Sequence, residues 1–179
     1  MLEVEIKIQP DSDAIAGLRD RLLHLSTGEP HLRKQEDLYF SHPSRDLKAR
    51  DEALRLRCDE GLTITWKGRK IDPPLKTREE IEFALGTDLA TATRLLEALG
   101  FRPVARVSKR REEWRLTEPY AATVCIDEVA GLGTFAEVEV LAEEAAAGRQ
   151  ALEAVLEVLG LSDQEAIPTS YLGLLERAR

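Results

Sequence analysis

The sequence predicts an α+β fold in which eight antiparallel strands close into a barrel, a tunnel with amphipathic helices packed outside it. Two observations lead to this prediction. The strand-like runs are joined mostly by short turns, which is typical of an antiparallel sheet. The polar face of most of these runs is almost purely Glu, Asp, Lys and Arg, where a solvated face usually also carries Ser, Thr, Asn and Gln. Since eight antiparallel strands are enough to close a barrel, the charged face would line a lumen.

The strand-like runs alternate apolar and charged side chains. In the first run, MLEVEIKIQP, Val4 and Ile6 alternate with Glu3, Glu5 and Lys7. For any single strand, the alternative is an open sheet with its charged face in water. Glycines in the turns DEGL and AGLG favour tight hairpins between neighbouring strands. The predicted strands are residues 2–8, 37–41, 53–59, 62–67, 78–84, 102–116, 121–128 and 134–141.

Three segments have the apolar periodicity of amphipathic helices, and each is followed or ended by a glycine that favours helix termination. A short fourth helix is predicted after Pro168, with Thr169 or Ser170 as its cap. The stretch 67–76, KGRKIDPPLK, contains two prolines and many charges, which predicts an exposed loop. The three longer helices are predicted at residues 11–27, 88–99 and 148–159.

The bulk composition indicates one domain spanning residues 1–179. The charge is mixed, with 25 Lys+Arg against 33 Asp+Glu and a net charge of -8, which argues against a general nucleic-acid binder. Two cysteines, Cys58 and Cys125, are too few for a disulfide scaffold and are expected to be reduced core thiols. The sequence contains no apolar run of about 20 residues, so no membrane span is expected, and a cytoplasmic location is the default expectation.

The signs of the charges cluster by strand. Acids dominate the strands at 3–5, 80–82 and 137–139, and bases dominate those at 55–57 and 109–111. Because burying an unpaired ion costs several kcal/mol, a lumen lined in this way needs ion pairs and a charged ligand. Paired carboxylates are ligands for Mg²⁺ or Mn²⁺, and Arg and Lys neutralise phosphate. The mixed lining therefore fits a metal–polyphosphate complex better than a metal or an anion alone.

Seven motifs of charged residues follow one another along the chain between residues 3 and 139. They are Glu3-Val-Glu5-Ile-Lys7, Arg55-Leu-Arg57, Lys67 in TWKG, Arg78-Glu-Glu80-Ile-Glu82, Lys109-Arg-Arg111, Asp127 in IDEV, and Glu137-Val-Glu139. This ordered set resembles the CYTH superfamily, the triphosphate tunnel metalloenzymes, which include class IV adenylyl cyclases, thiamine triphosphatases and inorganic triphosphatases. Two further stretches, QEDLYF at 35–40 and SYLGLL at 170–175, resemble the bacterial and archaeal class IV cyclase group.

The resemblance implies a tunnel that holds a triphosphate along its axis, with Mg²⁺ or Mn²⁺ as cofactor. The implied substrate-binding residues are Lys7, Arg55, Arg57, Lys67, Arg78, Lys109 and Arg111. The implied ligands of one metal are Glu3, Glu5 and Glu139, while Glu82, Asp127 and Glu137 are candidates for a second metal or for orienting water. The implied catalytic residues are Lys109, Arg111 and Asp127. Tyr39 and Tyr171 are assigned to packing, and Glu80 either shares the role of Glu82 or is its structural companion.

The function expected from the resemblance is that of a class IV adenylyl cyclase, which converts ATP to cyclic AMP and pyrophosphate. One alternative is a triphosphatase acting on thiamine triphosphate or inorganic triphosphate. A second alternative is a module that binds polyphosphate or nucleotides without catalysis. The expected partner is a nucleoside triphosphate or another triphosphate, not a nucleic acid or a membrane, and homodimerisation is left open.

Overall fold

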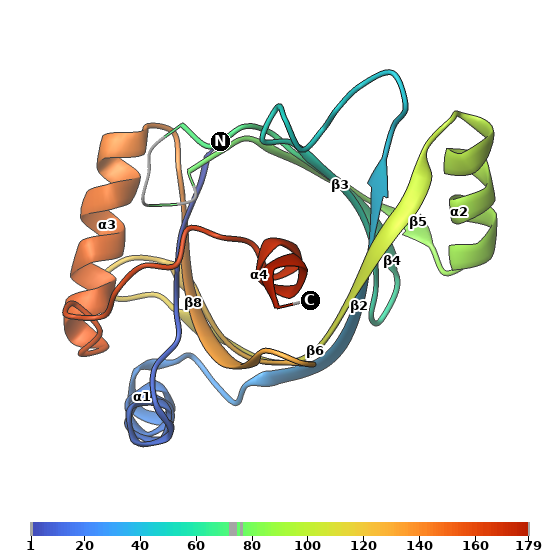
Figure 1. Ribbon diagram of the computed structural model, residues 1–179. Helices are drawn as coiled ribbons and strands as arrows, with labels where there is room; N and C mark the ends of the chain where they lie inside the picture. Colours follow the sequence, from blue (N-terminus) through green and yellow to red (C-terminus); the bar gives the residue numbers. More distant parts are fainter. Residues whose placement is uncertain (1, 72–74, 76, 179) are drawn as a thin grey trace.

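In the computed structural model, residues 2–71, 75 and 77–178 are described, and eight strands among them form one antiparallel sheet. The sheet curls around a central axis, as Figure 1 shows from one end. Its strand order is β1-β8-β7-β6-β2-β3-β4-β5. The strands are β1 (Leu2–Ile8), β2 (His31–Ser41), β3 (Ala53–Cys58), β4 (Leu62–Lys67), β5 (Glu80–Gly86), β6 (Arg102–Leu116), β7 (Ala122–Val129) and β8 (Gly133–Ala142).

The first strand of the sheet, β1, is joined to the segment just before the last strand, β5, by an isolated backbone bridge between Glu3 and Arg78. The amide of Glu3 donates to the carbonyl of Arg78 at 3.3 Å, and the amide of Arg78 donates back at 3.2 Å. This bridge brings the two edge strands together around the lumen. The predicted barrel is thereby confirmed, with a short junction between its edge strands. Residues 72–74 and 76 of the predicted loop at 67–76 lie outside the described part of the chain.

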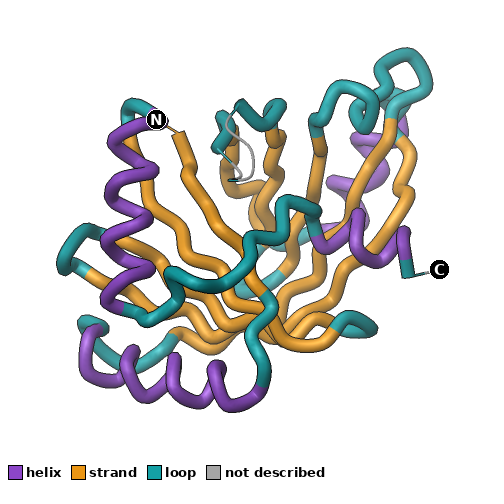
Figure 2. The backbone as a smooth tube through the Cα atoms, turned by 60° about the vertical axis from the view of Figure 1, so that its left-hand side comes forward, coloured by secondary structure: helices purple, strands orange, loops and turns teal. Residues whose placement is uncertain are grey.

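Three helices cover the outer, apolar face of the sheet (Figures 1 and 2). Helices α1 (Ser12–Leu25) and α3 (Ala145–Val158) pack with β1, β6, β7 and β8 in the largest hydrophobic cluster, where Val4 and Val138 are fully buried. Helix α2 (Leu89–Ala98) packs on β2, β3 and β4 around Leu56. The apolar core therefore lies between the barrel and its helices, as the alternation of the strands predicted. No helix within the described ranges is long and apolar enough to cross a membrane.

The short C-terminal helix α4 (Tyr171–Arg177) departs from this arrangement. It lies on the inner side of the curled sheet, within the ring of strands in Figure 1. Its first residue, Tyr171, is buried against Phe135, Val107 and Val129, with its ring centroid 5.1 Å from that of Phe135. The expectation of helices outside the barrel is therefore met by α1, α2 and α3 and not by α4. The reason is that Tyr171 finds both apolar packing and a hydrogen-bond acceptor inside the barrel.

The second strand is longer than predicted, because β2 begins at His31 and not at residue 37. It pairs with β6 from His31 opposite Glu113 onward. The missed residues, HLRKQE, are polar except for the exposed Leu32, so they carry no apolar alternation that would predict a strand. The consequence for the site is that β2 contributes more of the lumen wall than the sequence indicated.

Candidate active site

The lumen contains a cavity of about 860 Å³ that is lined by side chains from all eight described strands and from α4. A volume of this size is typical of sites for small molecules. Except for Asp127, every predicted site residue lines this cavity, so the alternation of the strands placed them on the correct face. These lining residues are Glu3, Glu5, Lys7, Arg55, Arg57, Lys67, Arg78, Glu82, Lys109, Arg111, Glu137 and Glu139.

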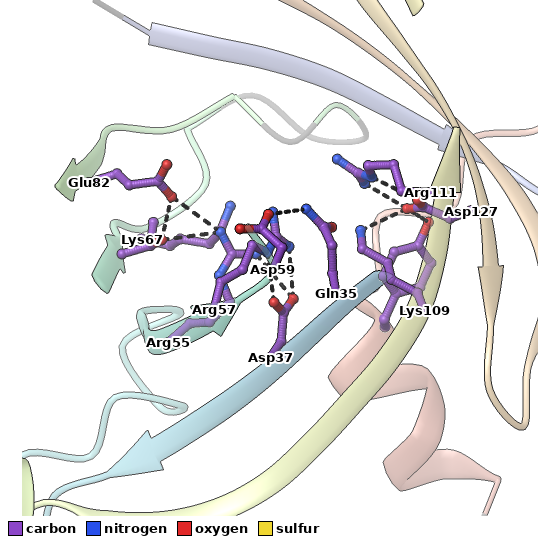
Figure 3. Close-up of polar contacts among 12 residues, drawn as sticks. Gln35, Asp37, Arg55, Arg57, Asp59, Lys67, Glu82, Lys109, Arg111 and Asp127 are labelled. Carbon is purple, nitrogen blue, oxygen red and sulfur yellow. Dashed lines mark hydrogen bonds and ion pairs between the residues drawn. The ribbon is translucent and has the colours of Figure 1, made fainter. Parts of the chain in front are cut away.

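One group of charges lies on the wall formed by β2, β3 and β4 (Figure 3). Asp37 accepts two hydrogen bonds from Arg57, at 2.7 and 2.8 Å, and one from Arg55 at 3.3 Å. Arg55 also donates to Thr65 at 3.2 Å and lies 3.5 Å from Glu82. Burial would raise the pKa of Asp37, but the two arginines hold it well below its ordinary value. The charged carboxylate of Asp37 thus holds both arginines of the R-x-R motif by hydrogen bonds.

A second group is centred on Asp127 of β7, which is fully buried (Figure 3). Its carboxylate accepts hydrogen bonds from Lys109 at 2.8 Å, from Arg111 at 2.7 and 2.6 Å, and from the hydroxyl of Tyr171 at 2.9 Å. Arg111 also donates to Glu137 at 2.5 Å. Burial would raise the pKa of Asp127, but Arg111 and Lys109 lower it below its ordinary value. In this arrangement Asp127 orients two cations that line the cavity.

The amine of Lys7 lies close to the start of α4 and to Glu137 of β8. Its Nζ donates to the carbonyl of Thr169 at 3.0 Å, lies 3.6 Å from Glu137 and sits 3.8 Å from the centroid of the Tyr171 ring. Nζ of Lys109 is 5.1 Å from the same ring. Cations over an aromatic face are stabilised by its quadrupole. Tyr171, which the sequence assigned to packing alone, therefore also contacts the charged lining.

A third group joins the two edge strands. Lys67 donates a hydrogen bond to Glu80, and its Nζ lies 4.0 Å from a carboxylate oxygen of Glu3. Arg78 donates to the same Glu80 at 3.1 Å. Glu80 thus bridges two predicted phosphate-binding cations, whereas Glu82 accepts from Thr65 at 2.5 Å. The two acids of the R-x-E-x-E motif have different partners in the structure.

Three predicted metal ligands, Glu3, Glu5 and Glu139, gather on neighbouring strands. Glu5 of β1 lies directly opposite Glu139 of β8, and Glu3 is the next lumen-facing residue of β1. Burial raises the pKa of Glu3 to about 9 against the opposing effect of Lys67, and Glu139, Glu80 and Glu5 raise it further. Burial also raises the pKa of Glu139 to about 7, with Glu5 adding to the rise. Carboxylates that disfavour one another's charge in this way would be stabilised by a bound cation.

The donor set of these three carboxylates fits Mg²⁺ or Mn²⁺, which prefer oxygen ligands. Among the described residues, no three His, Cys, Asp or Glu side chains are already arranged as a metal centre. Of the other predicted ligands, Asp127 and Glu137 are hydrogen-bonded to cationic side chains, and Glu82 accepts from Thr65 and lies 3.5 Å from Arg55. The metal roles of all these residues stay predictions, and the geometry favours the group of Glu3, Glu5 and Glu139.

Sequence reasoning missed the lumen-facing residues of β2. Arg33, Gln35, Asp37 and Tyr39 all line the cavity. The stretch QEDLYF contained the signal, since Gln35, Asp37 and Tyr39 share one face of a strand. Tyr39 was assigned to packing, and it does pack with Tyr171, but from the inner face of the sheet. The predicted strand began at residue 37, so it left out Arg33 and Gln35 and kept only Asp37 and Tyr39 of this face.

The two cysteines are expected to differ in reactivity. Cys125 is 2% exposed, and burial raises the pKa of its thiol to about 12, whereas Cys58 is partly exposed. Since the thiolate is the reactive form, only Cys58 should react rapidly with dithiobis-nitrobenzoate in the native protein. The second thiol should appear after unfolding in guanidinium chloride. Rapid reaction of two thiols in the native protein would contradict the buried position of Cys125, and the variant Cys58→Ser identifies the reacting residue.

Comparison with known protein families gives a match to the CYTH domain over residues 1–171. A protein of Methanocaldococcus jannaschii named "Putative adenylate cyclase MJ0240" is 36% identical over 178 residues, which cover 97% of this chain and 98% of the relative. "Adenylate cyclase CyaB" of Aeromonas hydrophila is 30% identical over 151 residues, covering 81% of this chain and 74% of the relative.

Solved structures show the same architecture. The PH1819 protein from Pyrococcus horikoshii OT3 superimposes with a TM-score of 0.85 at 35% identity, covering 99% of each chain. HpAC1 from Hippeastrum, named a "putative adenylyl cyclase" and described as having a dominant triphosphatase activity, gives a TM-score of 0.73. It is 19% identical and the match covers 99% of this chain and 96% of that one, so this likeness concerns the fold.

Proposed function

The chain belongs to the CYTH domain family, and on that premise we propose that it is a metal-dependent adenylyl cyclase. The reaction would convert ATP to cyclic AMP and pyrophosphate inside the lumen. The observation that carries the proposal is one cavity in which a group of three carboxylates accompanies two groups of cations, each held by a buried aspartate. The names of the two curated relatives support the cyclase reaction over other reactions of a triphosphate.

The cationic groups would bind the phosphates. Arg57, Lys109 and Arg111 line the cavity, and each is oriented by a buried aspartate, so their positions are set before the substrate arrives. Such pre-organised donors stabilise charge that develops on the leaving group without having to reorganise during the reaction. We assign these residues to the β- and γ-phosphates, together with Lys7, Arg55, Lys67 and Arg78. Asp127 is assigned to positioning Lys109 and Arg111.

In the proposed reaction, the ribose 3′-hydroxyl oxygen forms a bond to the α-phosphorus. The bond from the α-phosphorus to the bridging oxygen of the β-phosphate breaks, pyrophosphate leaves, and the hydroxyl proton is released. Glu3, Glu5 and Glu139 would hold the divalent metal, which when bound neutralises phosphate charge and lowers the pKa of a nearby hydroxyl. The cations of the lumen hold the triphosphate chain so that its α-phosphorus faces the hydroxyl.

The alternative is hydrolysis, in which water attacks the terminal phosphorus of a triphosphate. The same lining would serve this reaction, and Glu82 is then a candidate for orienting the water. The activity described for HpAC1 favours keeping this alternative, since that protein shares the fold. Binding of polyphosphate without catalysis is less well supported, because anion binding alone does not need the carboxylates.

One experiment separates these functions. The protein is incubated with Mg²⁺ or Mn²⁺ and, in parallel, with ATP, inorganic triphosphate or thiamine triphosphate, and the products are identified by chromatography. The proposal expects cyclic AMP and pyrophosphate in equal amounts from ATP, and no product when the metal is removed by EDTA. Orthophosphate without cyclic AMP would replace the cyclase by a triphosphatase. Binding without turnover of any of the three substrates would refute both enzymatic functions.

A further inference from the structure

A carboxylate on β2, Asp37, lies beneath the two arginines of the R-x-R motif (Figure 3). Asp37 is 2% exposed. Its Oδ1 accepts from Nε of Arg57 at 2.7 Å and its Oδ2 from Nη2 of Arg57 at 2.8 Å, which is a bidentate fork. The same Oδ2 accepts from Nη1 of Arg55 at 3.3 Å. One carboxylate on a neighbouring strand therefore fixes both guanidinium groups.

The contacts with Asp37 leave part of each guanidinium available. A guanidinium has five N–H donors in a rigid plane. Asp37 engages Nε and Nη2 of Arg57, and both arginines line the cavity. On Arg55, Nη1 bonds to Asp37 and Nη2 to Thr65, whereas Nε is buried and has no hydrogen-bond partner within the described chain. An acceptor from a ligand in the lumen would bind the remaining N–H groups that face the cavity.

We propose that Asp37 is a positioning residue that holds Arg55 and Arg57 in the orientation needed to bind phosphate oxygens. This inference rests on the proposed function, because it deepens the account of the same site. Asp37 would act as Asp127 does two strands away in the sheet, where one buried carboxylate orients Lys109 and Arg111. The triphosphate would then contact two neighbouring groups of cations, each organised by one aspartate.

The geometry argues for positioning more strongly than for stability alone. Buried ion pairs often contribute little net stability compared with apolar residues of similar size, so they are weak evidence for a purely structural role. A bidentate fork does, however, fix the plane of a guanidinium, and that plane decides which phosphate oxygens it can reach. Without the carboxylate, Arg57 would turn toward other acceptors and Arg55 would keep Thr65 and Glu82 as partners.

The test measures binding of Mg²⁺ with inorganic triphosphate by calorimetry, and KM and kcat for ATP, in Asp37→Asn. Loss of a charge-assisted contact that orients two arginines should weaken triphosphate binding about tenfold or more. KM should rise more than kcat falls. A purely structural role would instead reduce the active fraction and lower kcat at unchanged KM. The control is Glu112→Gln, which removes the bidentate pair of Glu112 with Arg19 on the outer face and should leave both constants unchanged.

A double-mutant cycle shows whether Asp37 acts through Arg57. Arg57→Ala should weaken triphosphate binding by itself, and adding Asp37→Asn should weaken it by much less than tenfold further. If the double variant instead lost affinity by the product of the two single losses, the inference would be overturned. It would also be overturned if Asp37→Asn folded and bound triphosphate as tightly as wild type.

A variant that keeps the charge covers the case in which Asp37→Asn does not fold. Asp37→Glu retains the carboxylate on a longer side chain, so it should fold and still bind triphosphate more weakly than wild type. Equal affinity of Asp37→Glu and wild type would then overturn the inference. If the wild-type protein bound no triphosphate, the proposed function itself would be refuted. If the wild-type protein bound triphosphate and substitutions of Asp37 did not change the affinity, only the inference about Asp37 would be refuted.

Discussion

Replacing both Glu5 and Glu139 with glutamine is expected to abolish metal-dependent turnover and leave the fold intact. The two carboxylates face each other across the β1–β8 pair and, with Glu3, are the donors assigned to the metal. Glutamine keeps the shape of each side chain but removes the charge that binds a divalent cation. Loss of a metal that neutralises phosphate charge should lower kcat/KM by at least about a hundredfold.

The fold should survive because the substitution removes two neighbouring carboxylates of like charge, one of which, Glu5, raises the pKa of Glu139. Circular dichroism and urea unfolding should therefore resemble those of wild type. The matched control is Glu112→Gln with Glu128→Gln, which removes two carboxylates from the outer face and should leave turnover unchanged. Undiminished metal-dependent turnover in Glu5→Gln/Glu139→Gln would refute the metal assignment.

The largest effect on stability is expected from Asp127→Asn. Asp127 is fully buried and accepts hydrogen bonds from Lys109, Arg111 and Tyr171. Removing one partner of a buried ionic group leaves the others uncompensated, which typically costs about 3–5 kcal/mol. The free energy of unfolding, measured with urea at pH 7, should fall by about that amount. Activity should fall as well, because both cations lose the group that orients them.

The effect of Asp127→Asn on the free energy of unfolding should depend on pH. The pKa of Asp127 is lower in the folded protein than its ordinary value, so its carboxylate stabilises the fold above that ordinary value. The contribution is lost as the pH falls through the lower, folded-state pKa. The difference between wild type and Asp127→Asn should therefore be largest near neutral pH and shrink in acid. A control is Asp88→Asn at the start of α2, where asparagine caps equally well and little change is expected. A small, pH-independent effect of Asp127→Asn would contradict the account.

The alternation of charged and apolar residues predicted the face of each strand. It placed Glu3, Glu5 and Lys7 in the lumen, and the structure has all three there. It could not predict the pairing of those charges, because partners such as Arg57 and Asp37 depend on the register of neighbouring strands. Most predicted element boundaries agree with the structure within a few residues, and the start of β2 is the main exception.

Two parts of the site could not be predicted from local sequence patterns. Asp37 was missed because it stood at the first position of the predicted strand 37–41, whereas in the structure it lies in the middle of β2 and pairs with Arg57 of β3. The place of α4 inside the ring of strands depends on a contact between Tyr171 and Asp127, which are 44 residues apart in the chain. A helix of seven residues with apolar side chains is compatible with packing on either side of the sheet, so only the tertiary structure decides between them.

The central claim is that the charged lumen binds a metal and a triphosphate together. It is tested most directly by a crystal structure with Mn²⁺ and inorganic triphosphate, measured at a wavelength where manganese scatters anomalously. The account predicts a manganese peak at the carboxylates of Glu3, Glu5 and Glu139, with phosphate density against Arg57, Lys109 and Arg111. Manganese and triphosphate bound elsewhere on the protein, with a lumen free of both, would contradict it.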